Sequence, residues 1–310
     1  MEERKIMNQI GFYEQLCTIL SKEQMLCKEP MSKHTTFRVG GPADYYVMPR
    51  TEQIAEVLSL CHKEQVPCHM IGNGSNLLVG DGGIRGVVLA LSKQAAQVQI
   101  QGNCLIAKAG ALLSQAAAAA YKAGLGGMEF AAGIPGSIGG AVVMNAGAYG
   151  GELKDVLVQA VVLTKEGKQQ TLKNSELELS YRHSCIPERN LVVLEAEFHL
   201  QPKQQEEIWA LMEDLKKRRI EKQPLEYPSA GSTFKRPKGN FAGKLIMEAG
   251  LAGVSVGGAQ VSEKHCGFVV NQGHATAADI RELIQLVQKK VFEHSGIELE
   301  TEVKYMGEFL

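Results

Sequence analysis

The residues best suited to hold a ligand lie in two glycine-rich segments. The first, at 71–80, reads IGNGSNLLVG and directly follows a strand predicted at 66–71. Glycines let the backbone approach a ligand closely, and successive peptide N–H groups in such a loop bind phosphate oxygens. The pattern predicts a diphosphate-binding loop, and a tight loop between two strands is the structural alternative. The candidate residues are Gly72, Asn73, Gly74, Ser75 and Asn76.

The second segment, at 133–151, reads GIPGSIGGAVVMNAGAYGG. Ten glycines fall between residues 124 and 151. They raise the entropy cost of folding, and close approach to a large flat ligand would account for that cost. A glycine-driven bulge or tight packing of a helix on a strand is the alternative. The first segment lacks the GK[ST] ending of a P-loop and does not match a GxGxxG that opens a long helix. The candidate residues of the second segment are Gly133, Gly136, Ser137, Gly139, Gly140, Asn145 and Gly147.

A sizeable fold must position these loops, and its composition excludes several classes of protein. A chain of 310 residues suggests two domains. With 33 Lys and Arg against 34 Asp and Glu, the net charge of −1 gives no general attraction to nucleic acid or to a membrane surface. Residues 130–151 carry no charged side chain, but their glycines and Pro135 argue against a membrane span. We expect neither nucleic-acid binding nor membrane insertion.

The cysteines and the first residues of the chain indicate a reducing compartment. The seven cysteines are scattered and include no CxxC pair, so the sequence predicts neither a disulfide framework nor a zinc knuckle. The eight histidines have no metal-binding spacing. The first 20 residues lack the apolar stretch of a signal peptide. We therefore expect a cytoplasmic protein without a metal site.

Hydrophobic periodicity predicts an α/β first region. A helix over 51–65 precedes the strand at 66–71, and an alanine-rich helix over 112–123 ends at a glycine. The turn at 165–168 predicts a hairpin. The other predicted strands of this region lie at 86–91, 105–107, 156–163 and 191–200.

The pattern changes near residue 203, where we place a domain boundary. A long amphipathic helix begins there, with Ile208, Leu211, Met212 and Leu215 as its predicted inner stripe. A loop over 224–239, a short helix ending at residue 250, a strand at 268–270 and a helix opened by a capping box at 276–279 follow. Alternation over 297–305 predicts a final strand, which carries three glutamates on one face.

Five motifs occur in an order similar to that of one enzyme family. They are GNGSNLLV, AGIPGSIGGAVVMNAGAYG, YRHS at 181–184, AGSTFKRP at 230–237 and LETEV at 299–303. Over residues 36–307 the chain resembles the UDP-N-acetylenolpyruvoylglucosamine reductases, specifically their shorter subclass without an extra substrate-covering loop. The resemblance implies a mixed α/β and α+β fold. Its first part is an FAD-binding region of the vanillyl-alcohol oxidase type over 1–203, with subdomains at about 1–91 and 92–203, and a substrate-binding α+β domain follows over 204–310.

The resemblance also implies the reaction. Hydride passes from NADPH to FAD and then to the enolpyruvyl group of the UDP-sugar, which gives UDP-N-acetylmuramate for peptidoglycan and cell-wall synthesis. Since no histidine lies in either glycine-rich segment, we expect FAD to be bound without a covalent link. We expect the partners to be UDP-N-acetylglucosamine enolpyruvate and NADPH, and the protein to be a monomer or a weak homo-oligomer.

Three catalytic residues follow from the matched motifs. Ser232 occupies the position of the proton donor, Arg182 that of the arginine that stabilises the substrate carboxylate, and Glu302 that of the catalytic carboxylate. Each has a structural alternative. Ser232 could be an ordinary turn residue, Arg182 a surface ion-pair partner of Glu178 or Glu188, and Glu302 one of several solvated glutamates on a strand.

Three basic residues are the candidate contacts of the UDP diphosphate, namely Lys222, Lys235 and Arg236. Arg236 stands where part of the family has asparagine, which leaves individual substrate contacts open. Tyr149 and His265 are secondary candidates for lining the site. The rival functions are a flavin oxidase or dehydrogenase of the same fold, acting on a small hydroxy compound, and a binding module without catalysis.

Overall fold

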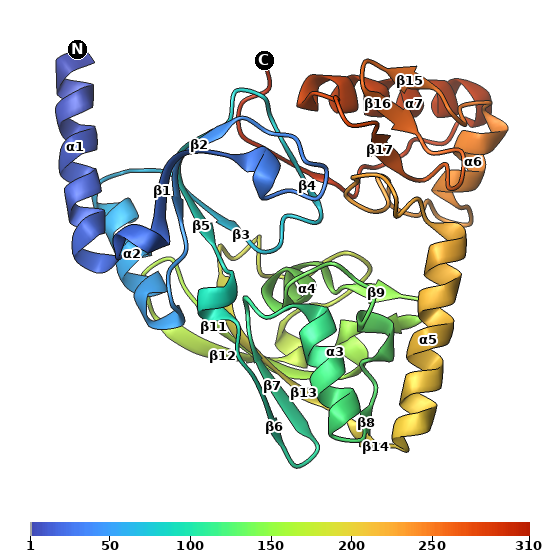
Figure 1. Cartoon of the computed structure of the whole chain (residues 1–310), viewed down its shortest axis with the longest axis horizontal. Helices are drawn as coiled ribbons and strands as arrows, with labels where there is room; N and C mark the ends of the chain where they lie inside the picture. Colours follow the sequence, from blue (N-terminus) through green and yellow to red (C-terminus); the bar gives the residue numbers. More distant parts are fainter. Residues whose placement is uncertain (1) are drawn as a thin grey trace. The chain divides into compact units, whose positions relative to one another are not determined.

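The computed structural model describes residues 2–310, with side chains from residue 11 onward (Figure 1). The chain forms two compact units, each built from three segments. Unit 1 comprises Met1–Lys28, Asp44–Asn73 and Gly86–Leu215, and unit 2 comprises Glu29–Ala43, Gly74–Arg85 and Lys216–Leu310. This division differs from the boundary predicted at residue 203, because two early segments join the C-terminal part. Strand pairing accounts for the second of these segments, because β4 (Leu77–Val79) pairs in parallel with β18 (Lys304–Met306).

A four-stranded sheet lies mostly in unit 1, in the order β1 (Met25–Pro30), β2 (Pro42–Val47), β5 (Ile84–Ala90) and β3 (Cys68–Ile71). Two helices belong to this part, α1 (Glu2–Ile19) and α2 (Ile54–Lys63). The predicted helix and strands form here, although the α-helix begins three residues late, after a 3₁₀ turn at Thr51–Gln53. Buried Ile54, Val57 and Cys61 give α2 the predicted apolar face.

A five-stranded antiparallel sheet completes unit 1. Its order is β12 (Gln169–Lys173), β11 (Leu157–Leu163), β13 (Val192–His199), β7 (Cys104–Lys108) and β6 (Val98–Gln101). Helix α3 (Leu113–Lys122) buries Ala116, Ala117 and Ala120, and α4 (Ile138–Met144) packs against β13. Two short pairs join β8 (Leu125–Gly126) to β14 (Gln201–Pro202) and β9 (Gly147–Ala148) to β10 (Gly151–Glu152). Together they hold the second glycine-rich segment beside the sheet.

Unit 2 has its own apolar core. It contains α6 (Ala242–Glu248), α7 (Ala277–Ser295) and the sheet β15 (Ser255–Val256), β16 (Ala259–Val261) and β17 (Val269–Asn271). The predicted capping box is present, because Thr276 Oγ1 accepts from Asp279 N and the Asp279 carboxylate accepts from Thr276 N. Helix α5 (Gln205–Lys222) runs from the end of unit 1 into unit 2.

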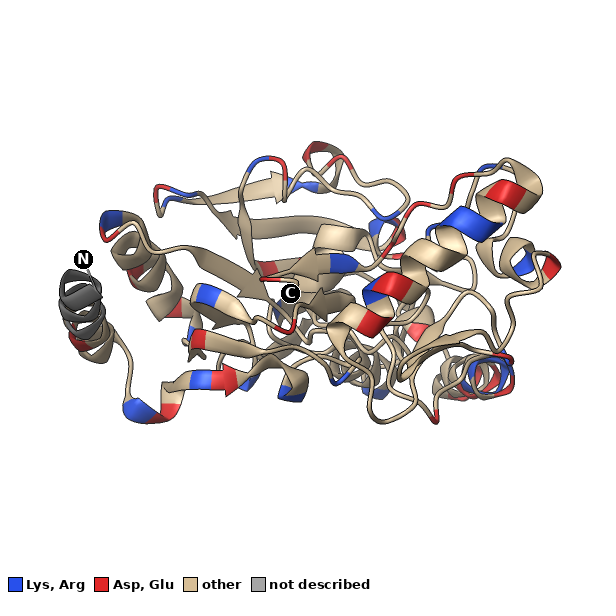
Figure 2. Ribbon diagram, turned by 90° about the horizontal axis from the view of Figure 1, so that it is seen from above, with Lys and Arg blue, Asp and Glu red and all other residues tan. Residues whose placement is uncertain are grey.

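Two sequence predictions need correction. The predicted strand at 297–305 is reduced to β18, since residues 297–303 make only an isolated bridge between Thr301 and Phe234. The predicted inner stripe of α5 is incomplete, because Ile208 is buried while Leu211 is 38% exposed. Charged residues of both signs are mixed along the helices and loops, as the net charge of −1 suggested (Figure 2). No helix among the described residues has the length and hydropathy of a membrane span.

Candidate active site

The two glycine-rich segments meet in unit 1. The Asn73 amide Nδ2 donates to the Pro135 carbonyl at 2.7 Å. A Cβ added at Gly72 would collide with Ser137 Oγ, so any larger residue there would have to displace the Ser137 side chain. The loop after β3 therefore packs directly on the loop that leads into α4, although the sequence alone gave no sign of this contact.

These loops offer peptide N–H donors, as a bound diphosphate requires. Among the described residues of unit 1, the hydrogen bonds include none from the peptide N–H of Gly133, Gly136 or Ser137. The Gly140 N–H reaches only Ser137 Oγ, at 3.5 Å. Gly133 and Gly140 are exposed. The residues present thus fit a ligand that brings several phosphate oxygens to one backbone surface.

Packing explains three of the other candidates. A Cβ at Gly139 would lie 3.0 Å from the Cβ of Ala109, and one at Gly147 would lie 2.7 Å from the Gly151 carbonyl oxygen. Asn145 is buried, has a φ of 41° and ends α4. The alternative of tight packing therefore describes these positions at least as well as ligand contact does.

The Asn145 side chain makes three hydrogen bonds inside unit 1. Its Nδ2 donates to Glu152 Oε2 at 3.0 Å and to the Ser180 carbonyl at 3.1 Å, and its Oδ1 accepts from Lys154 N at 2.9 Å. The Glu152 pKa is lowered, first by the Lys154 side chain, then by Asn145 and the charge of Arg182. Asn145 thus ties the end of α4 to the segment that carries Arg182.

Arg182 lies in a tight turn. Ser180 and His183 exchange backbone hydrogen bonds at 3.2 Å, which leaves Tyr181 and Arg182 as the two loop residues. Arg182 has a φ of 54°, a conformation that suits such a turn. The Ser184 hydroxyl donates to the Val143 carbonyl of α4 at 2.7 Å. The turn is therefore anchored to α4, which lies within the second glycine-rich segment.

Glu178 and Glu188, the alternative surface partners of Arg182, each lie close to another basic residue. Glu178 forms an ion pair with Arg189. Glu188 lies 3.7 Å from His183 Nδ1.

The segments that carry Ser232 and Glu302 pair in unit 2 through the backbone of Thr233. Thr233 is fully buried, its N–H donates to Gly267 O at 2.8 Å and its Oγ1 accepts from Val269 N at 2.9 Å. Its carbonyl accepts from the Glu302 N–H at 2.9 Å. The backbone of the residue that follows Ser232 is thus held by two other segments of unit 2.

The burial of Glu302 sets it apart from its neighbours. Glu302 is 9% exposed, whereas Glu298 and Glu300 are exposed to solvent. The Glu302 carbonyl accepts from Asn76 Nδ2 at 3.1 Å, and Lys304 N donates to the Asn76 carbonyl at 3.0 Å. The sequence interpretation of one solvated face is wrong for Glu302, because the alternation that predicted it belongs to a strand that does not form over 297–303.

The second half of the first glycine-rich loop belongs to unit 2. Gly74 has a φ of 63°, and an added Cβ there would collide with the His34 carbonyl oxygen. The Thr36 N–H donates to the Gly74 carbonyl at 3.2 Å. Ser75 is partly exposed. Sequence reasoning had not singled out the segment around Thr36, and neither glycine spacing nor charge marks it.

The three basic candidates differ in their surroundings. Lys222 is exposed in the last turn of α5, and the Lys235 ammonium pairs with the Glu300 carboxylate. Arg236 Nε donates to the Asn240 carbonyl at 3.3 Å, and its guanidinium lies 4.0 Å from the centre of the Phe241 ring. The structure thus brings Lys235 and Arg236 to the stretch that follows Ser232, while Lys222 lies on a helix.

The secondary candidates lie in different units. Tyr149, in unit 1, is 43% exposed with a φ of 54°. His265, in unit 2, accepts through Nδ1 from the Gly267 N–H at 3.1 Å, and burial lowers the His265 pKa. Since the Gly267 carbonyl also holds Thr233, His265 supports the segment that carries Ser232.

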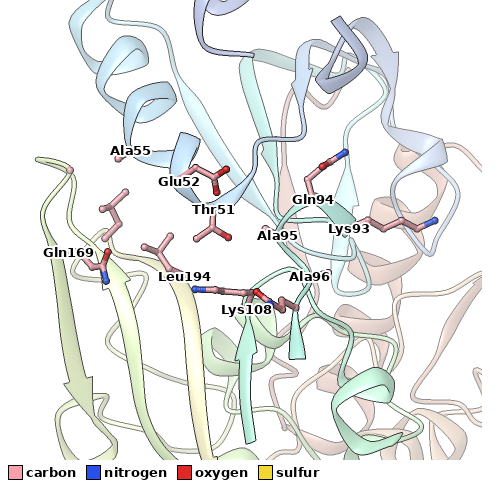
Figure 3. A pocket seen from close by; sticks show the side chains of 13 residues that line it. Thr51, Glu52, Ala55, Lys93, Gln94, Ala95, Ala96, Lys108, Gln169 and Leu194 are labelled. Carbon is pink, nitrogen blue, oxygen red and sulfur yellow. The ribbon is translucent and has the colours of Figure 1, made fainter. Parts of the chain in front are cut away.

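Unit 1 also has a cavity of about 500 Å³ (Figure 3). Thr51, Glu52, Lys93, Gln94 and Lys108 are among its lining residues, and none of the predicted site residues is. Lys108 pairs with Glu195 at 2.7 Å. This cavity is separate from the glycine-rich loops, and we assign it no role in the reaction.

Comparison with known proteins defines first the class and then the family. Residues 43–173 match the family described as FAD binding domain, and these residues include both glycine-rich segments. The protein is therefore a flavin-dependent oxidoreductase that carries FAD. Residues 223–306 match the family described as UDP-N-acetylenolpyruvoylglucosamine reductase, C-terminal domain.

Full-length relatives agree with this assignment. The chain is 56% identical to the UDP-N-acetylenolpyruvoylglucosamine reductase of Agathobacter rectalis, over 98% of this chain and 100% of the relative. It is 52% identical to that of Clostridioides difficile, over 97% and 100%. The crystal structure of the reductase from Thermus caldophilus superposes with a TM-score of 0.79 at 35% identity, covering 91% of this chain and 98% of the other. The chain belongs to the UDP-N-acetylenolpyruvoylglucosamine reductase family, and the predicted combination of an FAD-binding fold with a C-terminal α+β domain is confirmed.

Proposed function

We propose that this protein uses NADPH to reduce UDP-N-acetyl-3-O-(1-carboxyvinyl)glucosamine to UDP-N-acetylmuramate for peptidoglycan synthesis. The observation that carries the proposal is the backbone pairing of the buried Glu302 with Thr233, which joins the Glu302 segment to the loop that carries Ser232 in unit 2. That pairing unites two motifs that the family resemblance had linked only by their order.

FAD supplies the hydride acceptor and donor when it is bound. The peptide N–H groups of the two glycine-rich segments hold its diphosphate, without a covalent link. Contact between Asn73 and Pro135 keeps the two loops together before the cofactor arrives, so binding does not have to order them. The residues assigned to the FAD-binding site as a whole are Gly72, Asn73, Gly74, Ser75, Asn76, Gly133, Gly136, Ser137, Gly139, Gly140, Asn145 and Gly147.

Ser232 gives its hydroxyl proton to the carbon of the former double bond that does not receive hydride. A serine hydroxyl is a weak acid, so the transfer needs a site that excludes water and groups that hold the oxygen in place. The complete burial of Thr233 and the low exposure of Glu302 support such a site. The Glu302 carboxylate orients the donor.

Arg182 binds the carboxylate of the enolpyruvyl group and the charge that develops next to it. A guanidinium forms forked hydrogen bonds with a carboxylate, and this geometry requires that the arginine be held in place. The tight turn between Ser180 and His183 and its anchor on α4 provide this support.

Lys222, Lys235 and Arg236 bind the diphosphate of the UDP-sugar. Lys235 pairs with the exposed Glu300, so substrate binding exchanges one anionic partner for another. The stacking of Arg236 on Phe241 holds its guanidinium plane while the N–H edge remains suited to phosphate.

The enzyme works in the cytoplasm, as a monomer or a weak homo-oligomer, on its two small-molecule substrates. All seven cysteines are free thiols, which supports a reducing compartment.

Anaerobic absorption spectroscopy of the purified holoenzyme tests this function. The absorption band of the bound flavin at about 450 nm should bleach with NADPH and return on addition of the UDP-enolpyruvyl sugar. A flavin that NADPH cannot bleach, but that a small hydroxy compound reduces, would instead identify an oxidase or dehydrogenase. A protein that cannot be reconstituted with FAD would exclude both enzymes.

A further inference from the structure

One buried hydroxyl in unit 2 has no hydrogen-bond partner in the protein. Among the described residues, Thr36 Oγ1 is the single buried side-chain nitrogen or oxygen without one. A buried polar group that loses its bonds to water without replacing them destabilises the folded state. Such an atom in a native protein calls for a partner that the polypeptide itself does not supply.

The backbone of Thr36 lies next to the first glycine-rich loop. Its own N–H donates to the Gly74 carbonyl at 3.2 Å. The neighbouring His34 carbonyl packs so closely on Gly74 that only glycine fits there. Thr36 therefore lies against the second half of the glycine-rich loop, in the same unit.

Two polar groups of the residues adjacent to Thr36 are hydrogen-bonded within the protein. Thr35 Oγ1 donates to the Val39 carbonyl at 2.9 Å. The Phe37 carbonyl accepts from Asn271 Nδ2 at 2.9 Å. The unpaired hydroxyl of Thr36 therefore lies in a segment whose neighbouring residues are hydrogen-bonded within the protein.

We propose that the Thr36 hydroxyl donates a hydrogen bond to a phosphate oxygen of the FAD diphosphate. A hydroxyl can rotate to donate, and a phosphate oxygen is a strong acceptor that the adjacent loop is suited to hold. This inference rests on the proposed FAD site alone, and it adds a residue outside both glycine-rich segments to that site.

The proposal predicts opposite effects on the apoprotein and on cofactor binding. Thr36→Val keeps the shape of the side chain and removes the hydroxyl. In the apoprotein this change removes an unsatisfied polar atom, so the melting temperature should stay the same or rise. In the holoprotein it removes a hydrogen bond to a charged group, so FAD should bind roughly ten- to a hundredfold more weakly.

The experiment is a titration of apoprotein with FAD, followed by flavin fluorescence, together with thermal unfolding of the apoprotein. Wild type, Thr36→Val and Thr36→Ser are compared, because serine retains the hydroxyl and should bind FAD within a few-fold of wild type. Thr171→Val, at an exposed position in β12, is the matched control and should change neither quantity.

Three results would overturn the inference. FAD affinity of Thr36→Val equal to wild type would mean that the hydroxyl does not bind the cofactor. A lower melting temperature of the Thr36→Val apoprotein would indicate a structural role. A shifted flavin absorption band in fully loaded Thr36→Val would place the hydroxyl against the flavin ring and not the diphosphate. Failure of wild-type apoprotein to bind FAD would instead contradict the proposed function itself.

Discussion

The peptide N–H of Glu302 donates to the carbonyl oxygen of Thr233 at 2.9 Å. This bond joins the last segment of the chain to the loop that carries Ser232, and both Thr233 and Glu302 are buried. Because main-chain atoms make the bond, the relative position of Ser232 and Glu302 does not depend on either side chain. Substitutions at these two residues can therefore test chemistry with little effect on the local fold.

Replacing Ser232 by alanine should separate the two half-reactions. Only flavin reoxidation by the enolpyruvyl sugar consumes a proton from the donor. Stopped-flow absorbance should show flavin reduction by NADPH nearly unchanged in Ser232→Ala, and reoxidation by the sugar slower by roughly three or more orders of magnitude. Equal slowing of both half-reactions would contradict the assigned role.

Glu302→Gln should slow the same half-reaction while leaving FAD bound. The amide has the shape of the carboxylate but lacks its charge, and the backbone bond to Thr233 remains. We expect reoxidation to slow by roughly 10²- to 10⁴-fold. Glu298→Gln, an exposed neighbour in the same segment, should reoxidise like wild type. Similar losses in both variants would show that the segment acts through its overall charge.

Local sequence signals predicted much of the secondary structure. The capping box at Thr276 and Asp279 fixed the start of α7, and the turn at 165–168 joined β11 to β12 as expected. Both signals act within a few residues, so the sequence contains all the interactions that produce them.

The remaining features depend on contacts between distant segments. Alternating residues over 297–305 predict a strand, but alternation describes any extended backbone, and only the partner decides whether a strand forms. Here the partner β4 covers three residues. The burial of Glu302 and the contact of Gly72 with Ser137 likewise arise from pairings that no local pattern encodes. The family resemblance therefore names the candidate site residues, which remain predictions, but it does not give the contacts that support them.

Gly72→Ala should destabilise unit 1 unless Ser137 is also changed. The new Cβ meets Ser137 Oγ, while the Ser137 Cβ lies 3.4 Å away, an ordinary contact. Gly72→Ala should lower the free energy of unfolding by roughly 1–3 kcal/mol. Ser137→Ala should cost about 1 kcal/mol, because Ser137 caps α4.

The double variant should be more stable than the sum of the single effects predicts. Urea unfolding of the two single variants and the double variant gives the coupling energy, which we expect to exceed about 1 kcal/mol in the favourable direction. Additive effects would mean that the two loops do not contact each other as the structure shows.

His265 should make stability depend on pH. Burial lowers the folded-state His265 pKa below its usual value of 6.5, and Nδ1 accepts from the Gly267 N–H only while it carries no proton. As pH falls below about 6.5, the unfolded chain takes up a proton that the folded chain resists. The contribution of His265 to stability is thus present above that pH and is lost as pH falls toward the folded-state pKa.

His265→Asn, whose Oδ1 can replace the Nδ1 acceptor, should unfold in urea with a weaker pH dependence between pH 7.5 and pH 5. His294→Asn, at an exposed position in α7, is the control and should keep the wild-type dependence. An unchanged pH dependence in His265→Asn would show that other groups account for the acid sensitivity.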